Sequence, residues 1–409
     1  MKKKIAVIGG GAAGLTAAIS AARAGADVTV FERLDRAAKK ILATGNGRCN
    51  LTNLGADISH YHGETVKFVS GALNRFWVQD TLNFFLEIGL VTKTEEGGKV
   101  YPYSLQASAV SDVLRMEAER LSVPVRCGFE VTDIVKNKNG FKLIFSNGES
   151  FVCGSVILTA GGKASPNLGS NGSGYTLSKK MGHSITPLFP SLVQVKTDNT
   201  YTKALQGLKI IARACFCENN TVKKEAFGEV LFTDYGLSGP PVFDLSRLSS
   251  VSKNGEIVLD IMPEYTKDEV QKLLKDRISA SKTLENYFTG LLPKKLGQIL
   301  LKSCGIAPLS QKSTVLSAKE ISALTEKIKG WHFKVLGTMS WNNAQVTAGG
   351  VRTSEVNPAT MESKLVKNLF LAGEVLDIDG DCGGYNLQWA WSSGYLAGLN
   401  AAKQSREDV

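Results

Sequence analysis

The chain has 409 residues, of which 43% are apolar and 21% are charged, and its formal net charge is +10. This length predicts roughly two to three domains, and the lack of any apolar run near the ~18 residues of a bilayer span excludes a transmembrane helix. Residues 1–4 precede only a short apolar segment, which is too short for the core of a signal peptide. We therefore expect a cytoplasmic protein without membrane contact.

Cysteine usage and charge narrow the possible partners. The seven cysteines are scattered and include no C-x-x-C pair, so they predict no disulfide framework, no metal site and no dithiol reductase. The lysines are dispersed along the chain rather than clustered. Nucleic acid is therefore a minority interpretation of the positive charge.

The N-terminal segment has the pattern of a pyrophosphate-binding turn. A short apolar strand at 4–8 leads into glycines and then into an alanine-rich helix. Gly9 permits the tight turn, Gly11 lets the backbone approach phosphates, and Gly14 allows the helix to pack closely on the strand. The ligand expected from this pattern is a dinucleotide.

A second apolar strand at 27–31 strengthens this interpretation. It ends in Glu32, where an acidic side chain can accept hydrogen bonds from ribose hydroxyls. The first helical residues, Ala12 and Ala13, offer N–H groups to anionic oxygens. Together with Arg33, these residues form the predicted site for the ADP part of the dinucleotide.

The following residues predict a functional loop, two helices and a small sheet. The segment 34–63 has little periodicity, and a long irregular stretch inside a compact domain is usually functional. Apolar spacing predicts helices at 73–90 and 105–121. Strands expected at 125–135, 141–146 and 151–158 form a β-meander inserted in the nucleotide domain.

The rest of the chain predicts an insertion and then a return to the first domain. The buried strand 155–159 exits at Ala160 and Gly161, two candidate cofactor contacts, without a second phosphate fingerprint, so one dinucleotide fold is expected. The predicted division is 1–188 for the first part of the dinucleotide-binding domain, 189–264 for a β-rich domain, 265–330 for a helical subdomain, 331–352 for return strands of the β-rich domain, and 353–409 for the second part of the dinucleotide-binding domain.

The C-terminal segment distinguishes a flavin from a nicotinamide. A strand at 368–372 is followed by a glycine turn with acidic residues and by a helix from about 387 to 402. Such a unit can hold the ribityl chain of an extended FAD and direct a helix N-terminus at the flavin edge. The candidates are Gly373, Glu374 and, as second choice, Asp377 for the ribityl part, with the backbone N–H groups of Asn386, Leu387 and Gln388 for the flavin edge.

Four segments carry a resemblance to a known family. They are Lys39–Asn53, Gly228–Pro240, Gln345–Val351 and Gly383–Ala390. In this order they resemble the bacterial NAD(P)/FAD-dependent oxidoreductases of the BaiN-like and HI0933-like family, which are also known as aminoacetone-oxidase-like. The resemblance implies FAD in an α/β, glutathione-reductase-like Rossmann domain with a three-layer ββα arrangement, an inserted β-rich domain and a helical subdomain.

The same resemblance points to further cofactor contacts. In the signature loop, Lys40 and Arg48 can neutralise phosphate, the glycines allow backbone approach, and asparagine amides can reach ring heteroatoms. The additional candidates are Gly45, Asn46, Gly47, Cys49, Asn50 and Val131, the last as a backbone contact to adenine. For Cys49 packing is favoured over redox exchange. Tyr385 and Trp341 are suggested as walls of the substrate site by their motif positions alone.

These features predict an FAD-dependent oxidoreductase that transfers a hydride through flavin N5 on a small or planar substrate. Amine oxidation and reduction of an enone or steroid-like acid both stay open, with NAD(P)H as a transient electron donor. No catalytic residue is assigned, because hydride transfer is the cofactor's own chemistry. The four histidines are interpreted as structural or surface groups. The alternatives are an FAD-dependent RNA-modifying enzyme and a non-catalytic flavin-binding module.

Overall fold

The computed structural model describes residues 4–278 and 283–407. The chain divides into two compact units. Unit 1 contains Met1–Phe189 and Gln345–Val409, and unit 2 contains Pro190–Ala344. Each unit has a separate hydrophobic core.

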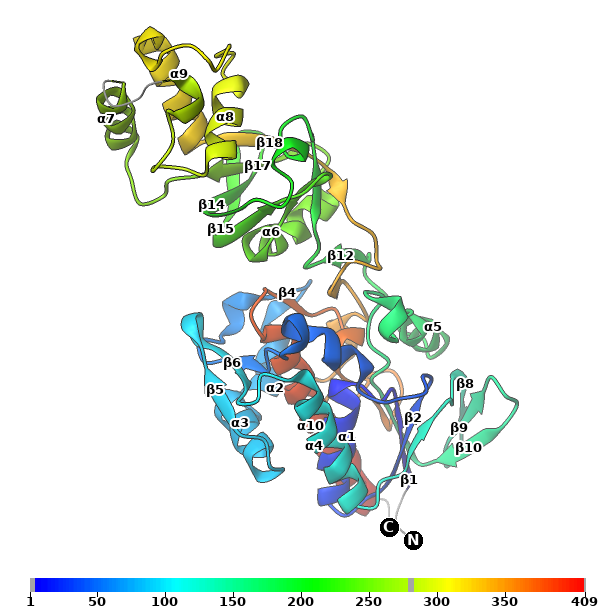
Figure 1. Cartoon of the computed structure of the whole chain (residues 1–409). Coiled ribbons are helices and arrows are strands. Elements are labelled where there is room, and N and C mark those ends of the chain that lie inside the picture. Colours follow the sequence, from blue (N-terminus) through cyan, green and yellow to red (C-terminus); the bar gives the residue numbers. More distant parts are fainter. Residues whose placement is uncertain (1–3, 279–282, 408–409) are drawn as a thin grey trace. The chain divides into compact units, whose positions relative to one another are not determined.

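A parallel sheet forms the centre of unit 1 (Figure 1). Its strands follow the order β20-β11-β1-β2-β7. They are β20 (Leu369–Leu371), β11 (Ser155–Leu158), β1 (Lys4–Ile8), β2 (Asp27–Glu32) and β7 (Val125–Cys127). The apolar runs of β20, β11, β1 and β2 are buried almost throughout, as expected for parallel strands covered on both faces, whereas the edge strand β7 is only partly buried. The C-terminal strand β20 pairs with β11, so both ends of the sequence complete one sheet.

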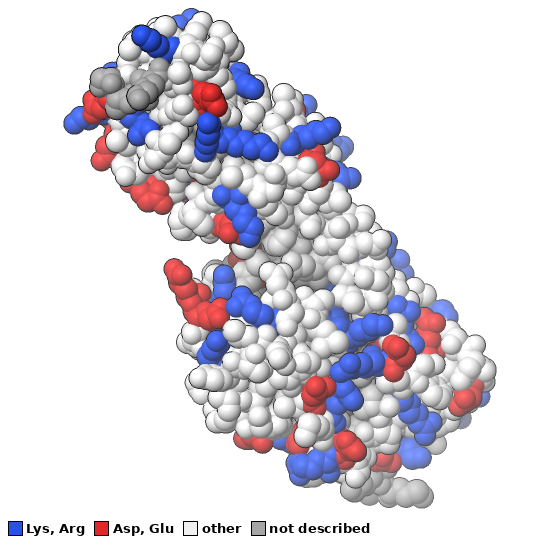
Figure 2. Space-filling model, in the orientation of Figure 1, with Lys and Arg blue, Asp and Glu red and all other residues white. Residues whose placement is uncertain are grey.

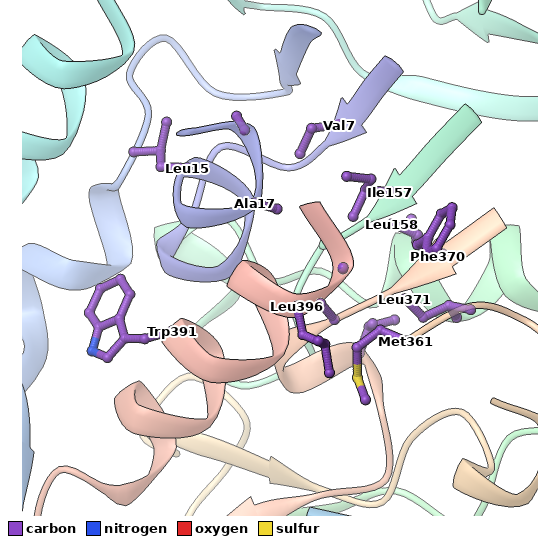
Figure 3. Packing of buried hydrophobic residues seen from close by; sticks show 14 of the residues in the cluster. Val7, Leu15, Ala17, Ile157, Leu158, Met361, Phe370, Leu371, Trp391 and Leu396 are labelled. Carbon is purple, nitrogen blue, oxygen red and sulfur yellow. The ribbon is translucent and has the colours of Figure 1, made fainter. Parts of the chain in front are cut away.

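Two helices from opposite ends of the chain cover one face of this sheet. Figure 3 shows side chains of α1 (Ala12–Arg23) and α10 (Tyr385–Glu407) meeting those of the strands. A Cβ added at Gly394 would lie 2.4 Å from the carbonyl oxygen of Ala13, and one at Gly398 would lie 2.1 Å from that of Ala17. The two glycines therefore provide the smooth helix face that allows this close approach.

The β-meander packs on the other strands through aromatic rings. It consists of β8 (Val131–Asn137), β9 (Gly140–Phe145) and β10 (Ser150–Cys153), in the order β10-β9-β8. The ring of Phe31 on β2 lies 4.8 Å from that of Phe145 and 4.9 Å from that of Phe151, centroid to centroid. With the helices and the parallel sheet, the meander forms the third layer of the predicted ββα arrangement.

The remaining elements of unit 1 surround these layers. The helices are α2 (Val69–Leu73), α3 (Val78–Glu87), α4 (Ala107–Arg120) and α5 (Ser173–Lys180). The short strands are β3 (Thr52–Asn53), β4 (Tyr61–His62), β5 (Thr92–Thr94), β6 (Lys99–Pro102), β19 (Val346–Ala348) and β21 (Asp379–Gly380). The strand β12 (Phe189–Ser191) spans the sequence boundary between the units.

Unit 2 combines a closed barrel with helices. The barrel order is β13-β16-β15-β14-β17-β18. Its strands are β13 (Val195–Thr197), β14 (Lys209–Glu218), β15 (Thr221–Phe232), β16 (Gly236–Ser238), β17 (Gly255–Asp260) and β18 (Trp331–Thr338). The helices are α6 (Pro240–Val251), α7 (Lys267–Arg277), α8 (Lys294–Ser303) and α9 (Ala318–Lys329). The barrel and these helices belong to one compact unit, and the division into a β-rich domain and a helical subdomain stays a prediction.

Several predicted elements differ from the structure. The single helix expected at 73–90 is wrong: α2 ends at Leu73 and α3 starts at Val78, because the Asp80 carboxylate accepts the Trp77 N–H at 2.8 Å and caps a new helix. The strand expected at 125–135 is also broken, by a left-handed turn at Gly128. The return strands expected at 331–352 are divided between the units, since β19 belongs to unit 1.

No helix in residues 4–278 and 283–407 has both the length and the apolar composition needed to cross a bilayer. On the face drawn in Figure 2, basic and acidic side chains are interspersed with uncharged surface.

Candidate functional site

The glycine turn after β1 has a different steric requirement at each position. Gly9 adopts φ 103°, and a Cβ there would lie 2.5 Å from the Thr159 carbonyl oxygen. A Cβ at Gly14 would lie 1.8 Å from the Gly9 carbonyl oxygen, so this position keeps turn and helix together. At Gly11, by contrast, a Cβ would meet none of the described residues within 4 Å. The turn is therefore tightly packed against the protein at Gly9 and Gly14 and has free space beside Gly11.

The start of α1 presents positive potential to that open side. The helix has no side-chain cap and no acidic residue in its first turn, and its N–H groups and macrodipole favour an anion. The Glu32 carboxylate accepts the N–H of Gly10 at 2.8 Å and that of Leu34 at 2.9 Å. These bonds fix the carboxylate at the end of β2, beside the turn. Ala12 and Ala13 begin the helix as predicted.

Lys40 and Glu374 form a polar cluster that joins both ends of the sequence. Lys40 Nζ lies 2.8 Å from Glu374 Oε2. The other carboxylate oxygen of Glu374 accepts the N–H of Thr347 at 3.0 Å. A Cβ at Gly162 would lie 2.7 Å from Glu374 Oε1, which requires glycine there. The sequence predicted Lys40 for a phosphate contact and Glu374 for a ribityl contact. In the structure the two side chains form an ion pair with each other.

Thr347 is a member of this cluster that sequence reasoning missed. Its hydroxyl oxygen accepts the N–H of Lys163 at 2.7 Å and that of Ala164 at 3.0 Å. These bonds hold the turn that follows Ala160 and Gly161 at the carboxyl end of β11. The resemblance segment Gln345–Val351 contains Thr347, but nothing in the segment indicates its partners.

The signature loop contains several strained residues and a paired arginine. Asn46 and Cys49 have φ of 56° and 59°, in the left-handed region, and Asn46 and Gly47 are exposed. The Arg48 guanidinium pairs with Glu95 at 3.2 Å and lies 4.4 Å from the centre of the Tyr101 ring. Arg48 therefore has an acidic partner within the protein, which the sequence did not predict.

Asn50 provides a direct test of whether the site fits a cofactor. Its Oδ1 atom is buried and has no hydrogen-bond partner among the described residues. A Cβ added at Gly384, just before α10, would lie 3.0 Å from this atom. Because buried polar atoms are almost always paired, the unpartnered amide oxygen fits a bound ligand with a donor. The open Gly11 and the uncapped α1 fit the phosphates of a dinucleotide in the same way.

The predicted flavin-edge amides at the start of α10 are only partly available. The Gln388 N–H donates to the Gly384 carbonyl at 3.0 Å, inside the helix, so this contact differs from the expectation. The Gln388 side chain is fully buried and bonds Thr52 and Thr81. Asn386 uses its side chain to bond both backbone groups of Gly380. The N–H groups of Asn386 and Leu387 lie in the first turn of the helix.

Other predicted contacts lie at the edges of this region. Arg33 donates to the carbonyl oxygens of Gly169 and Pro166, at 3.0 and 3.4 Å. Asp377 is buried and accepts the Glu64 N–H at 3.0 Å. Val131 is the first residue of β8 and is buried. Their contacts with a cofactor stay predictions.

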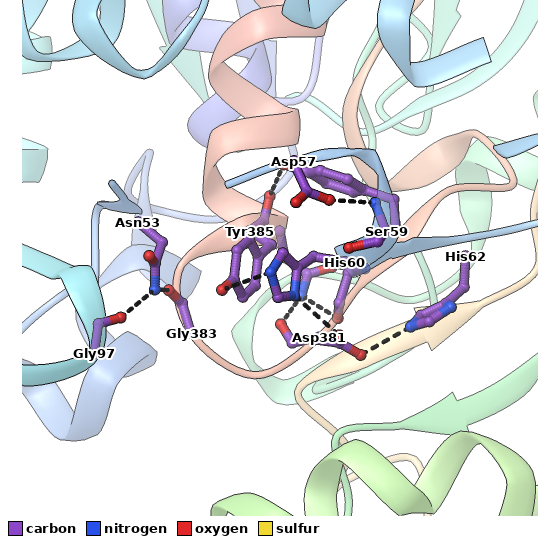
Figure 4. A network of polar contacts seen from close by, with 12 residues as sticks. Asn53, Asp57, Ser59, His60, His62, Gly97, Asp381, Gly383 and Tyr385 are labelled. Atoms are coloured by element: carbon purple, nitrogen blue, oxygen red, sulfur yellow. Dashed lines mark hydrogen bonds and ion pairs between the residues drawn. The ribbon is translucent and has the colours of Figure 1, made fainter. Parts of the chain in front are cut away.

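A second missed cluster surrounds Asp381 (Figure 4). The Asp381 carboxylate lies 2.8 Å from His62 Nε2 and 3.3 Å from His60 Nδ1. The other imidazole nitrogen of His60 lies 3.4 Å from the Tyr385 hydroxyl, and the two rings stack with centroids 4.2 Å apart. We name these four residues the Asp381 cluster. Two histidines that were interpreted as structural thus share one carboxylate at the start of α10.

The backbone holds the Asp381 cluster in place. Strands β4 and β21 pair so that Asp379 opposes His62, and the Asp381 N–H donates to the His60 carbonyl at 2.9 Å. Asn53 ties the following loop by donating to the Gly383 carbonyl at 3.2 Å. The signal available in the sequence was the His60–Tyr61–His62 run within the irregular segment 34–63.

His183 illustrates the opposite case of a histidine with a structural role. It lies between Glu355, at 3.0 Å, and the Ser363 hydroxyl, at 2.9 Å. The Ser363 oxygen also accepts the N–H groups of Leu365 and Val366. Burial lowers the pKa of His183. With its lone pairs engaged and its position buried, Ser363 is a loop anchor and no nucleophile.

Cys49 is also a packing residue. Its side chain is fully buried, and burial raises the pKa of the Cys49 thiol to about 12. The group therefore stays a neutral thiol at physiological pH.

The open phosphate turn, the parallel sheet and the C-terminal cluster define a protein of the FAD-binding Rossmann class.

Comparison with known proteins gives the family. The HI0933-like protein Rossmann domain matches residues 3–400. The chain belongs to this family and is an FAD-dependent oxidoreductase. The expected fold class and family are confirmed.

Named relatives cover nearly the whole chain. The 3-dehydro-bile acid delta(4,6)-reductase of Clostridium scindens is 42% identical over 409 residues, which cover 98% of this chain and 99% of the relative. A ribosomal RNA dihydrouridine synthase of Haemophilus influenzae is 32% identical over 405 residues, 97% of this chain and 98% of the relative. The solved 3-ketosteroid-delta4-(5alpha)-dehydrogenase from Rhodococcus jostii is 15% identical with a TM-score of 0.49, over 98% of this chain and 97% of that one.

Proposed function

We propose that this oxidoreductase reduces a carbon–carbon double bond conjugated with a carbonyl group in a small, planar, steroid-like substrate. The observation that carries the proposal is the full-length similarity, at 42% identity, to a relative named for a 3-dehydro-bile acid and its double bonds at positions 4 and 6. The name of the second relative supports the same reaction type. Dihydrouridine is uridine in which a ring double bond conjugated with a carbonyl has been saturated.

The residues of the site have distinct roles in this proposal. FAD, when bound, supplies the hydride from N5 of its reduced form. The start of α1 and the backbone at Gly11 bind the pyrophosphate, and Glu32 orients the ribose. Lys40 and Glu374 present charge and hydrogen-bonding groups to the ribityl part. The N-terminus of α10 provides positive potential for the negative charge of the reduced ring.

NAD(P)H is the proposed electron donor, and it binds transiently. Among the described residues, one parallel sheet carries a glycine turn of the phosphate-binding kind, and it is the one assigned to FAD. A second dinucleotide would therefore bind without a dedicated fold. We infer a short-lived complex that reduces the flavin and dissociates before the substrate enters.

A second candidate is reduction of uridine in RNA. It is favoured by the two relatives at 32% identity that are named ribosomal RNA dihydrouridine synthase, and by the net charge of +10. RNA binding through phosphates would weaken steeply with salt. Reduction of a free enone would not, which separates the two candidates.

The experiment is an anaerobic two-step assay on purified protein loaded with FAD. In the first step, NADH, NADPH and a panel of amines are tested for bleaching of the flavin absorbance. In the second step, the reduced protein is mixed with 3-oxo-4-ene steroids, or with uridine-containing ribosomal RNA fragments at low and high salt.

The proposal expects bleaching by NADH or NADPH and reoxidation by the steroid enone, with a saturated product. Reoxidation by RNA alone, lost at high salt, would favour the second candidate. Bleaching by amines with reoxidation only by oxygen would contradict both and indicate amine oxidation.

A further inference from the structure

The Asp381 cluster lies in unit 1 and has no part in the binding roles described above. Tyr385 is the first residue of α10, directly after Gly384, whose neighbour is the unpartnered amide oxygen of Asn50. Tyr385 is 7% exposed, and its ring stacks on His60, whose side chain is 32% exposed. A buried phenol thus connects through one imidazole to the outside of the unit.

The geometry points to Tyr385 as the proton donor of the reduction, with His60 and Asp381 as positioning residues that restore its proton. This inference rests on the proposed function, because a conjugated double bond needs a proton in addition to a hydride. Tyr385, suggested by the sequence only as a wall of the substrate site, thereby gains a catalytic role.

The arrangement of hydrogen bonds sets the direction of the relay. The Asp381 carboxylate faces Nδ1 of His60, which favours a hydrogen on that nitrogen and leaves Nε2 turned to the Tyr385 hydroxyl. The distance of 3.4 Å to the hydroxyl is long, but catalytic hydrogen bonds often tighten only when substrate binds. His62 holds the second carboxylate oxygen at 2.8 Å and keeps the carboxylate in this orientation.

The proposed step balances in atoms and charge. The substrate accepts a hydride at the β-carbon, and its double-bond electrons move to form an enolate. The Tyr385 O–H bond breaks, its proton forms the new C–H bond at the α-carbon, and a phenolate remains. The phenolate regains its proton from Nε2 of His60, after a proton from solvent has reached the imidazole at its exposed side. The net addition is one hydride and one proton.

Local packing explains why a tyrosine can hold this position. A Cβ at Gly383 would lie 2.9 Å from the Tyr385 ring, and one at Gly380 would lie 2.8 Å from its Cβ. The Tyr61 hydroxyl donates to the Tyr385 carbonyl at 3.2 Å. Burial keeps the pKa of Tyr61 well above its usual range, so this second phenol stays a structural donor.

The first experiment tests the cluster without the reaction. In the flavin-free protein, the 15N resonances of the His60 imidazole are compared between wild type, Tyr385→Phe, Asp381→Asn and Tyr103→Phe. Phenylalanine keeps the stacked ring and removes only the hydroxyl. We expect a shift at Nε2 for Tyr385→Phe, a shift at Nδ1 for Asp381→Asn, and no change for Tyr103→Phe, since Tyr103 is 68% exposed and outside the site. Unchanged His60 resonances in the first two variants would overturn the inference.

The second experiment separates proton donation from structure. Each variant is loaded with FAD, reduced anaerobically and mixed either with a 3-oxo-4-ene steroid or with oxygen, which takes electrons without forming a C–H bond. Loss of a general acid typically costs about 100-fold or more. Tyr385→Phe should therefore be reoxidised about 100-fold more slowly by the enone, with FAD content and reoxidation by oxygen unchanged. His60→Gln should fall in between, and His332→Gln, which breaks a histidine–glutamate pair in unit 2, should have no effect.

The outcomes distinguish the inference from the function on which it rests. If wild type is reoxidised by the enone and Tyr385→Phe is equally fast, only the proton-donor assignment is overturned. An equal slowing by enone and oxygen would indicate a structural defect and would also overturn it. If no enone reoxidises the wild type, the proposed function fails and the assignment falls with it, even where the His60 resonances respond.

Discussion

Lys40 and Glu374 are 334 positions apart in the sequence, and their charged groups lie 2.8 Å apart. One residue comes from the signature loop and the other from the turn after β20. Their side chains are 26% and 21% exposed, so the pair is partly shielded from water. It connects the two segments that the sequence contributes to the FAD-binding fold.

This shielding predicts a measurable coupling between the two residues. Removal of either charge leaves the other without its partner, so Lys40→Met and Glu374→Gln should each destabilise unit 1. A double-mutant cycle on urea unfolding should give a coupling of about 1 kcal/mol, within the range for contacting residues. The same cycle on Lys209 and Glu229, an ion pair whose members are 58% and 46% exposed, should give a few tenths at most. Equal couplings in the two cycles would contradict the prediction.

The glycine turn predicts opposite effects for two similar substitutions. Gly11→Ala adds a methyl group where no described residue lies within 4 Å, and the φ of −83° is ordinary for alanine. The apoprotein should keep its stability but bind FAD at least about tenfold more weakly, because the methyl group occupies the phosphate approach. Gly14→Ala places a methyl group 1.8 Å from the Gly9 carbonyl oxygen and should destabilise the apoprotein by about 1–3 kcal/mol.

Calorimetry and flavin fluorescence titration check these two variants. If Gly11→Ala binds FAD with wild-type affinity, the phosphates do not approach the turn at that glycine. Loss of apoprotein stability in Gly11→Ala would instead mean that the space at Gly11 is filled by the protein.

Removal of FAD should affect one unit and leave the other unchanged. A ligand that binds only the folded state stabilises by about 2.7 kcal/mol at one hundred times its Kd. Because the two units have separate cores, calorimetry should resolve two transitions, of which only that of unit 1 moves to lower temperature on FAD removal. A matching shift of the unit 2 transition would show that the units do not unfold independently.

Buried Cys49 predicts a decrease of stability at alkaline pH. Its pKa rises from an ordinary value of 9.0 to about 12, so above pH 9 the unfolded chain loses a proton that the folded chain keeps. The stabilisation is complete below pH 9 and is lost as the pH rises toward about 12. Between pH 8 and pH 10, Cys49→Ala should therefore lose about 1.4 kcal/mol less unfolding free energy in total than the wild type. Urea titrations between pH 8 and pH 10 measure the slopes, and identical slopes would argue against a buried thiol.

Local patterns predicted the parts of the fold whose physics is local. The apolar runs of β1, β11 and β20 and the turn at Gly9 are each recognisable within a few residues, because burial on both faces and a positive φ restrict composition directly. The prediction of a single helix at 73–90 was wrong because a second local signal acts within the same residues. Its break depends on the Asp80 carboxylate capping a new helix start, which competes with apolar spacing that continues across the break.

The site was less predictable because its partners are distant in the sequence. Nothing in the composition around Arg48 indicates Glu95, and nothing around His60 indicates Asp381, 321 positions away. The structure differs from the expectation for Gln388 because its N–H donates to the carbonyl of Gly384, four residues earlier, at the start of α10. Such pairings follow from strand register, as between β4 and β21, which a single sequence does not reveal.

The pairing of β20 with β11 and the packing of α10 on α1 also set an order of events during synthesis. Unit 2 is contiguous, from Pro190 to Ala344, and it can form its barrel while the ribosome is still adding the last segment. Unit 1 cannot complete its fold until residues 345–409 emerge. Until then, the edge of β11 and the surface of α1 that later packs against Gly394 and Gly398 stay uncovered. Unit 1 is thus the later of the two to fold, and chaperone binding during translation would be directed to this uncovered surface of β11 and α1.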